Sequence, residues 1–158
     1  MTTTATARDV GLRWLTALCS GDAETAISLM TDDFRYCLPG SLPTAGWWDR
    51  DGFFEVAQML PPFLSGPLTV RLGDVTAQDD RVWVEAESEA PLPAGGTYSN
   101  AYVFALKVRD GKVVEMKEYC DALPVLETVD SPRTRGPRKP RESALTVVTA
   151  TIQGPATQ

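Results

Sequence analysis

The chain has 158 residues, the length of one domain, and an ordinary globular composition with 43% hydrophobic and 23% charged residues. It contains no histidine, which excludes Ser-His and Cys-His catalysis and histidine metal sites. No apolar run reaches transmembrane length and the N-terminus lacks the order of a secretory signal, so we expect a cytoplasmic protein with no membrane partner.

The three cysteines, Cys19, Cys37 and Cys120, are widely spaced and form no C-x-x-C pair. We interpret them as reduced, mostly buried residues. No phosphate loop, nucleotide fingerprint or metal cluster is present in the sequence, so we predict no cofactor and no metal site.

In chain order, helical spacing of apolar residues predicts a first helix over residues 7–19 and a shorter second helix from Asp22. A short strand over residues 34–38 follows. A loop then contains the pair Trp47-Trp48, which could cover a pocket, form a dimer surface or pack on the core. A third helix is expected over residues 51–60, ending at Pro61-Pro62.

After the helices the pattern changes to β-rich segments separated by turn signals. We expect strands over residues 68–76, 82–89, 97–108 and 113–121. The order predicts an α+β fold in which three N-terminal helices pack on one face of a curved antiparallel sheet and form a cone with an apolar pocket.

The composition changes again beyond residue 130. Residues 1–130 carry 10 Lys and Arg against 20 Asp and Glu, whereas residues 131–158 carry 5 against 1. We therefore divide the chain into a domain, 1–130, and a basic, Pro-rich linker and tail, 131–158, in which residues 145–152 could form an extra edge strand. The acidic domain argues against a nucleic-acid partner.

Asp121 is the first candidate for a catalytic residue, because it is a carboxylate at the end of the last predicted strand among apolar and aromatic neighbours. The alternative is that it caps the following turn or forms an ion pair. Tyr36 could donate to a developing oxyanion, or it could only pack. Glu118 has the opposite strand parity from Asp121, and we interpret it as a surface charge.

Several motifs resemble those of a known family: Leu18-x-x-Gly21-Asp22, Asp32-Asp33-Phe34-x-Tyr36, Tyr98-x-Asn100-x-Tyr102-x-Phe104, and Asp110-Gly-Lys-Val with Glu118-Tyr-x-Asp121. Together they resemble the SnoaL-like polyketide cyclases of the nuclear transport factor 2-like superfamily, over about residues 7–128. The resemblance implies a hydrophobic pocket inside an α+β cone, and Asp121 matches the family's acid/base aspartate. Family activities include aldol cyclisation, steroid isomerisation and epoxide hydrolysis, so the fold does not select one.

Some positions depart from the relatives of this fold. Leu38 stands at the place of the steroid isomerases' base and of an asparagine in limonene-type epoxide hydrolases. Ala86 and Ser88 stand at the places of the hydrolases' arginine and first aspartate. These departures argue against both activities.

The resulting hypothesis is a protein that binds a small apolar metabolite and performs cofactor-free acid/base chemistry with Asp121 and Tyr36. The alternative is a non-catalytic ligand-binding or interaction module, and we expect a homodimer in either case. The residues predicted to line the ligand site are Trp14, Asn100, Tyr102, Phe54, Met59 and Tyr119.

Overall fold

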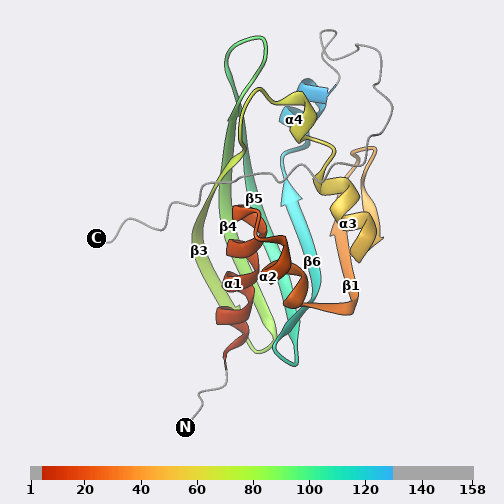
Figure 1. Cartoon of the computed structure of the whole chain (residues 1–158), viewed down its shortest axis with the longest axis vertical. Helices are drawn as coiled ribbons and strands as arrows, with labels where there is room; N and C mark the ends of the chain where they lie inside the picture. Colours follow the sequence, from red (N-terminus) through yellow and green to blue (C-terminus); the bar gives the residue numbers. More distant parts are fainter. Residues whose placement is uncertain (1–4, 130–158) are drawn as a thin grey trace, which may run out of the picture.

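The computed structural model describes residues 5–129 as four α-helices, one short 3-10 helix and six strands (Figure 1). The tail predicted over residues 131–158 lies outside the described residues. The elements, in chain order, are α1 Ala7–Ser20, α2 Ala23–Ser28, β1 Met30–Leu38, β2 Gly46–Asp49, α3 Arg50–Ala57, η1 Pro61–Phe63, β3 Thr69–Gln78, β4 Arg81–Pro91, β5 Thr97–Arg109, β6 Lys112–Cys120 and α4 Ala122–Val129.

The ends of the first helices follow from local sequence signals. Thr6 and Asp9 form a capping box at the start of α1, and Gly21 ends the helix with a left-handed backbone at φ 76°. Asp22 then caps α2 by accepting from the Thr25 amide at 3.1 Å. Asp49 caps α3 in the same way, through the Gly52 amide at 2.9 Å. The three predicted N-terminal helices are therefore confirmed.

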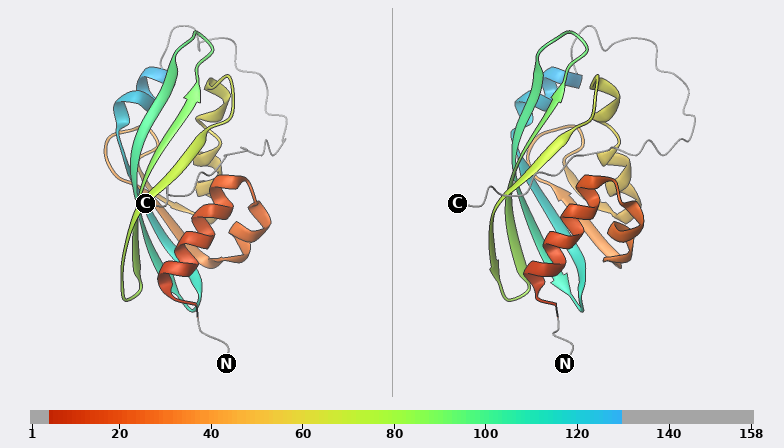
Figure 2. Two further views of the ribbon diagram at one scale, coloured as in Figure 1. Left: turned by 90° about the vertical axis from the view of Figure 1, so that its left-hand side faces the viewer. Right: turned by 60° about the vertical axis from the view of Figure 1, so that its left-hand side comes forward.

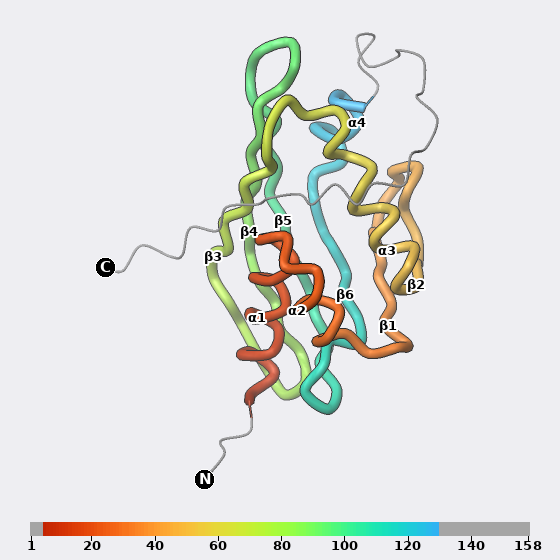
Figure 3. Tube along the Cα trace, in the orientation of Figure 1, coloured from red at the N-terminus to blue at the C-terminus, as the bar shows by residue number. Residues whose placement is uncertain are grey.

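The sheet has the strand order β2-β1-β6-β5-β4-β3. All neighbouring pairs are antiparallel except β1 and β6, which run parallel. The prediction of a wholly antiparallel sheet is wrong at this one pair. The Cα trace in Figure 3 shows β1 beside β6, although more than 70 residues separate them in the chain, so only tertiary packing brings them together.

Two elements were not expected from the sequence. Trp47 and Trp48 belong to the short strand β2, in which they pair with Cys37 and Tyr36 of β1, instead of lying in a loop. A fourth helix, α4, follows β6 and begins directly after Asp121. The sequence has no clear signal for either element, because both are short and depend on contacts with the rest of the fold.

Helices α1, α2 and α3 lie on the same side of the curved sheet (Figure 2). We call this covered side the inner face and the opposite side the outer face. The hydrophobic core lies between the inner face and the helices, and its largest fully buried side chains are those of Trp14, Tyr36, Tyr98, Phe34, Leu15, Met30 and Met116. Burial of this apolar surface is the main contribution to the stability of the arrangement.

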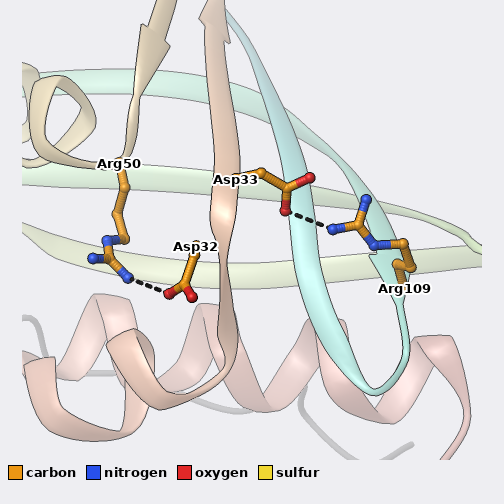
Figure 4. A network of polar contacts seen from close by, with 4 residues as sticks. All are labelled: Asp32, Asp33, Arg50 and Arg109. Carbon is orange, nitrogen blue, oxygen red and sulfur yellow. Dashed lines mark hydrogen bonds and ion pairs between the residues drawn. The ribbon is translucent and has the colours of Figure 1, made fainter.

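Ion pairs at the surface join β1 to its neighbours. Figure 4 shows Arg50, at the start of α3, beside Asp32, with a nitrogen-oxygen distance of 3.3 Å, and Arg109, at the end of β5, beside Asp33. Both pairs are largely exposed and screened by solvent, so they contribute little to the stability of the fold.

Candidate functional site

Strand β6 presents an acidic side chain to the interior of the domain. Met116, Glu118 and Cys120 alternate along one face of the strand, and Met116 is fully buried. Glu118 is half-buried and is paired across the sheet with Phe104, a buried inner-face residue. The interpretation of Glu118 as a surface charge is therefore wrong; counting two residues from the apolar Met116 would have placed it on the inner face.

The Glu118 carboxyl has a neighbour on β1. The Tyr36 hydroxyl donates a hydrogen bond to Glu118 Oε2 at 3.0 Å. Burial raises the pKa of Glu118 from 4.5 to about 6, and the hydrogen bond from Tyr36 partly opposes this increase. Burial and the nearby carboxylate raise the pKa of the Tyr36 hydroxyl in turn. The pair thus combines an acid that titrates near neutral pH with a tyrosine that stays protonated.

The charge of the Glu118 carboxylate affects the pKa of two thiols. Burial raises the pKa of Cys19, on α1, to about 12, and the charge of Glu118 adds to the effect. The same two causes raise the pKa of Cys120 to about 12. Because a reactive cysteine needs an accessible thiolate, both thiols are poor nucleophiles, as expected from the sequence.

Further along the inner face, four polar side chains form a hydrogen-bonded network. Ser88 and the Tyr102 hydroxyl are 3.0 Å apart, the hydroxyls of Tyr102 and Tyr98 are 3.3 Å apart, and Asn100 Nδ2 donates to the Tyr98 hydroxyl at 3.0 Å. The sequence left open whether Asn100 and Tyr102 line a cavity or form a core network. The contacts are those of a core network, in which each buried polar group has a partner.

Asn100 also attaches the end of β6 to β5. Its amide nitrogen donates to the Asp121 carbonyl at 2.9 Å, and its amide oxygen accepts from the Asp121 backbone N-H at 3.1 Å. This paired contact mimics one more step of the sheet ladder just after Cys120. Both hydrogen-bonding groups of the Asn100 side chain are therefore used within the fold.

The Asp121 side chain is exposed and lies at the start of α4. Its Oδ1 accepts from the Leu123 amide at 3.0 Å, which is the turn-capping contact considered as an alternative in the sequence analysis. The structure therefore does not bring Asp121 and Tyr36 together in one hydrogen-bonded site. The catalytic role of Asp121 stays a prediction, and the geometry favours Glu118 for it.

The other residues predicted to line the ligand site do not lie together in one site. Trp14 is fully buried against Phe34, with ring centroids 5.8 Å apart, and its Nε1 has no hydrogen-bond partner among the described residues. Phe54 is half-buried on α3, whereas Met59 is exposed. Tyr119 lies on the outer face, so it is not part of the same site as Trp14 and Tyr102.

Within residues 5–129, no group of three or more cysteine, aspartate or glutamate side chains has a spacing that could hold a metal ion. None of the helices in this part of the chain has the length and apolar character needed to span a membrane.

Comparison with solved structures places the domain in the nuclear transport factor 2-like fold. TerC co-crystallised with polyporic acid matches with a TM-score of 0.67 and 24% identity, covering 79% of this chain and 98% of TerC. IdmH from Streptomyces antibioticus, a proposed polyketide cyclase, matches with a TM-score of 0.67 and 24% identity over 80% and 99% of the two chains. A nuclear transport factor 2-like protein from Burkholderia xenovorans LB400 matches with a TM-score of 0.61 and 22% identity over 80% and 98%.

The sequence itself identifies the family within that fold. The family model of the SnoaL-like domain matches residues 12–116, so the chain belongs to the SnoaL-like family. Among curated proteins, no sequence matches this chain.

Proposed function

We propose that this protein binds a small apolar, carbonyl-bearing metabolite at the inner face and moves a proton on it with Glu118. The observation that carries the proposal is the half-buried Glu118 carboxyl, with a pKa of about 6 and the Tyr36 hydroxyl 3.0 Å away. A general base is most effective when its pKa lies near the working pH, and at neutral pH this carboxyl is mostly ionised while remaining basic enough to accept a proton.

The neighbours of Glu118 suit this role. The carboxylate would accept a proton from carbon next to a ligand carbonyl. Tyr36, whose hydroxyl stays protonated, would hold the carboxylate in position as a hydrogen-bond donor. Membership of the SnoaL-like family makes cyclase-type acid/base chemistry the natural reaction class to test.

A second candidate is a ligand-binding module without chemistry. Aromatic packing around Phe53 favours it, because this ring contacts Trp14, Phe34, Tyr36 and Phe54 with centroid distances of 5.0 to 6.1 Å. Such packing restricts the room that a reacting ligand would have beside Tyr36.

Proton exchange distinguishes the two candidates. Polyporic acid and a series of benzo-fused cyclic ketones beginning with 2-tetralone would be titrated against the full chain by tryptophan fluorescence. Polyporic acid has no hydrogen on a carbon next to a carbonyl, so it reports binding only. Each ketone that binds would then be followed in deuterated water by NMR for exchange of the hydrogens next to its carbonyl. We expect exchange whose rate rises with pH through about 6 and is lost in Glu118→Gln.

Glu115→Gln is the matched control, since Glu115 is on the same strand but forms an ion pair with Arg35 on the outer face. Loss of exchange in Asp121→Asn with full exchange in Glu118→Gln would return the catalytic role to Asp121. Binding without exchange would establish the second candidate, a ligand-binding module without chemistry. An absence of binding throughout the series would refute both candidates.

A further inference from the structure

The inner face of the sheet is partly uncovered at one level between the helices. Figure 2 shows α1 and α2 against the half of the sheet that ends at the turn between β5 and β6. Along the inner face of β5, Phe104 and Asn100 are buried, whereas Tyr102 between them is partly exposed. Glu118, on the neighbouring strand β6, is half-buried. A ligand that enters at this level therefore meets Tyr102 and Glu118.

The register of the sheet brings these two side chains near each other. Phe104 is paired with Glu118 and Tyr102 with Cys120, so Tyr102 and Glu118 are diagonal neighbours on the inner face, about 7 Å apart. The ring of Tyr102 is stacked on that of Phe104, at 19° with centroids 5.3 Å apart, which holds the ring in place. A carbonyl group and the carbon next to it can bridge such a gap, with a contact of about 3 Å at each end.

The Tyr102 hydroxyl belongs to a chain of three hydroxyls that has one hydrogen more than its contacts use. Ser88, Tyr98 and Tyr102 supply one hydroxyl hydrogen each, and the contacts of Tyr102 with Ser88 and with Tyr98 use two of them. Asn100 accepts none, because it contacts the Tyr98 oxygen as a donor, through Nδ2. Within residues 5–129, no other group accepts a hydrogen bond from these hydroxyls.

Burial decides which oxygen presents the third hydrogen to a ligand. Ser88 and Tyr98 are only 3% and 2% exposed, whereas Tyr102 is partly exposed. A buried hydrogen without an acceptor is avoided when Ser88 and Tyr98 both donate to the Tyr102 oxygen and Tyr102 donates outward from the network. The two bonds that Tyr102 accepts also polarise its hydroxyl and strengthen the bond that it donates.

A donor is needed at this place because the interior carries no positive charge. Among residues 5–129 no lysine or arginine is buried, and the buried polar residues are Ser88, Asn100 and Thr128. When the Glu118 carboxylate takes a proton from carbon, the electron pair of the broken C–H bond forms a carbon–carbon double bond, and the carbonyl oxygen becomes negatively charged. In a partly buried site this charge is stabilised by hydrogen-bond donors that are already in position.

We propose that the Tyr102 hydroxyl donates a hydrogen bond to the carbonyl oxygen of the ligand, next to the carbon from which Glu118 removes a proton. Ser88 and Tyr98 are positioning residues that orient this hydroxyl. Burial raises the pKa of Tyr102, so the hydroxyl keeps its hydrogen throughout. The matching ligand is an uncharged ketone, because a ligand carboxylate would meet the Glu118 carboxylate without a cation to compensate it. The catalytic consequence rests on the proposed proton transfer, whereas the hydrogen bond can be observed without a reaction.

The hydrogen bond is tested by ¹³C NMR of a bound ketone. 2-Tetralone, or the first ketone of the series that binds, would be labelled with ¹³C at its carbonyl and bound to the full chain carrying Glu118→Gln, which cannot remove the proton. Because a hydrogen bond to a carbonyl oxygen moves the carbonyl ¹³C signal to higher chemical shift, adding Tyr102→Phe should move the bound signal to lower chemical shift. Adding Tyr119→Phe, which removes an exposed hydroxyl from the outer face, should leave it in place.

The exchange rate supplies a second readout in the protein that retains Glu118. Tyr102→Phe should lower the rate of hydrogen exchange next to the carbonyl about 100-fold or more, the usual loss when a donor to an oxyanion is removed. Ser88→Ala leaves Tyr98 as a donor to Tyr102, so it should lower the rate only about two- to tenfold. Urea denaturation shows whether each variant is folded. If Tyr102→Phe is not, Ser88→Ala decides, and an unmoved carbonyl signal in Ser88→Ala would overturn the proposal.

The outcomes separate this proposal from the proposed function. A carbonyl signal that is the same with and without the Tyr102 hydroxyl would overturn the hydrogen bond, even where exchange depends on Glu118. A signal that depends on Tyr102, without exchange in the unmodified protein, would support the hydrogen bond and refute proton transfer to Glu118. If no ketone of the series binds, both are refuted.

Discussion

The half-buried carboxyl of Glu118 leads to a quantitative prediction about stability and pH. Its pKa is about 6 in the folded protein against 4.5 as the ordinary value, so between these pH values the folded state retains a proton that the unfolded state has lost. Stability contributed by this residue is therefore fully present below about pH 4.5 and is lost as the pH rises through about 6. The difference between the two pKa values corresponds to about 2 kcal/mol.

Glu118→Gln removes the titration and keeps an oxygen that accepts from Tyr36. We expect the free energy of unfolding of the variant, relative to the unmodified protein, to increase by about 2 kcal/mol between about pH 4.5 and about pH 8. Urea denaturation at a series of pH values measures this difference directly. Glu115→Gln, which removes an outer-face ion pair with a distance of 3.7 Å, should show a change of less than about 1 kcal/mol over the same range.

A difference that stays flat with pH would refute the burial of this carboxyl. So would a Glu118→Gln variant that becomes less stable than the unmodified protein as the pH rises, because then the charged form would be the stabilised one.

Substitutions at Tyr36, Asn100 and Asp121 test three further sets of contacts. Tyr36→Phe removes the donor to Glu118, so it should lower the free energy of unfolding by about 1.5–3 kcal/mol at neutral pH and raise the pKa of Glu118, as measured by NMR titration. Asn100→Ala breaks both bonds to the Asp121 backbone and should cost about 2–3 kcal/mol in urea denaturation, whereas Ser99→Ala next to it should change stability by less than about 0.5 kcal/mol. Asp121→Asn keeps the capping oxygen and should cost less than about 0.5 kcal/mol, while Asp121→Ala should cost about 1 kcal/mol; equal effects of the two would show that the cap at 3.0 Å is not formed.

The candidate site shows where reading the sequence succeeded and where it failed. Tyr36 was identified from its motif, and it does lie in the interior beside an acid. Glu118 was wrongly placed on the surface, because its side of β6 was counted from Asp121 instead of from the buried Met116. Asp121 lies after the strand, so its side chain is not bound by the strand's alternation, whereas Glu118 shares the buried face of Met116.

Local signals determined much of this protein from the sequence alone. The capping box at Thr6 and Asp9, the glycine at position 21 and the alternation along β4 act over a few residues, so they can be read without knowing the fold. Together with the SnoaL-like motifs they define the α+β domain and its helix-covered sheet.

Other features were decided only by the tertiary structure. The parallel pairing of β1 with β6 brings together Tyr36 and Glu118, which are 82 positions apart in the sequence. The short strand β2 and helix α4 form against a completed sheet. The pKa of Glu118 depends on desolvation by the surrounding core. Because these properties arise from groups that meet only after the chain has folded, spacing along the sequence contains no direct record of them.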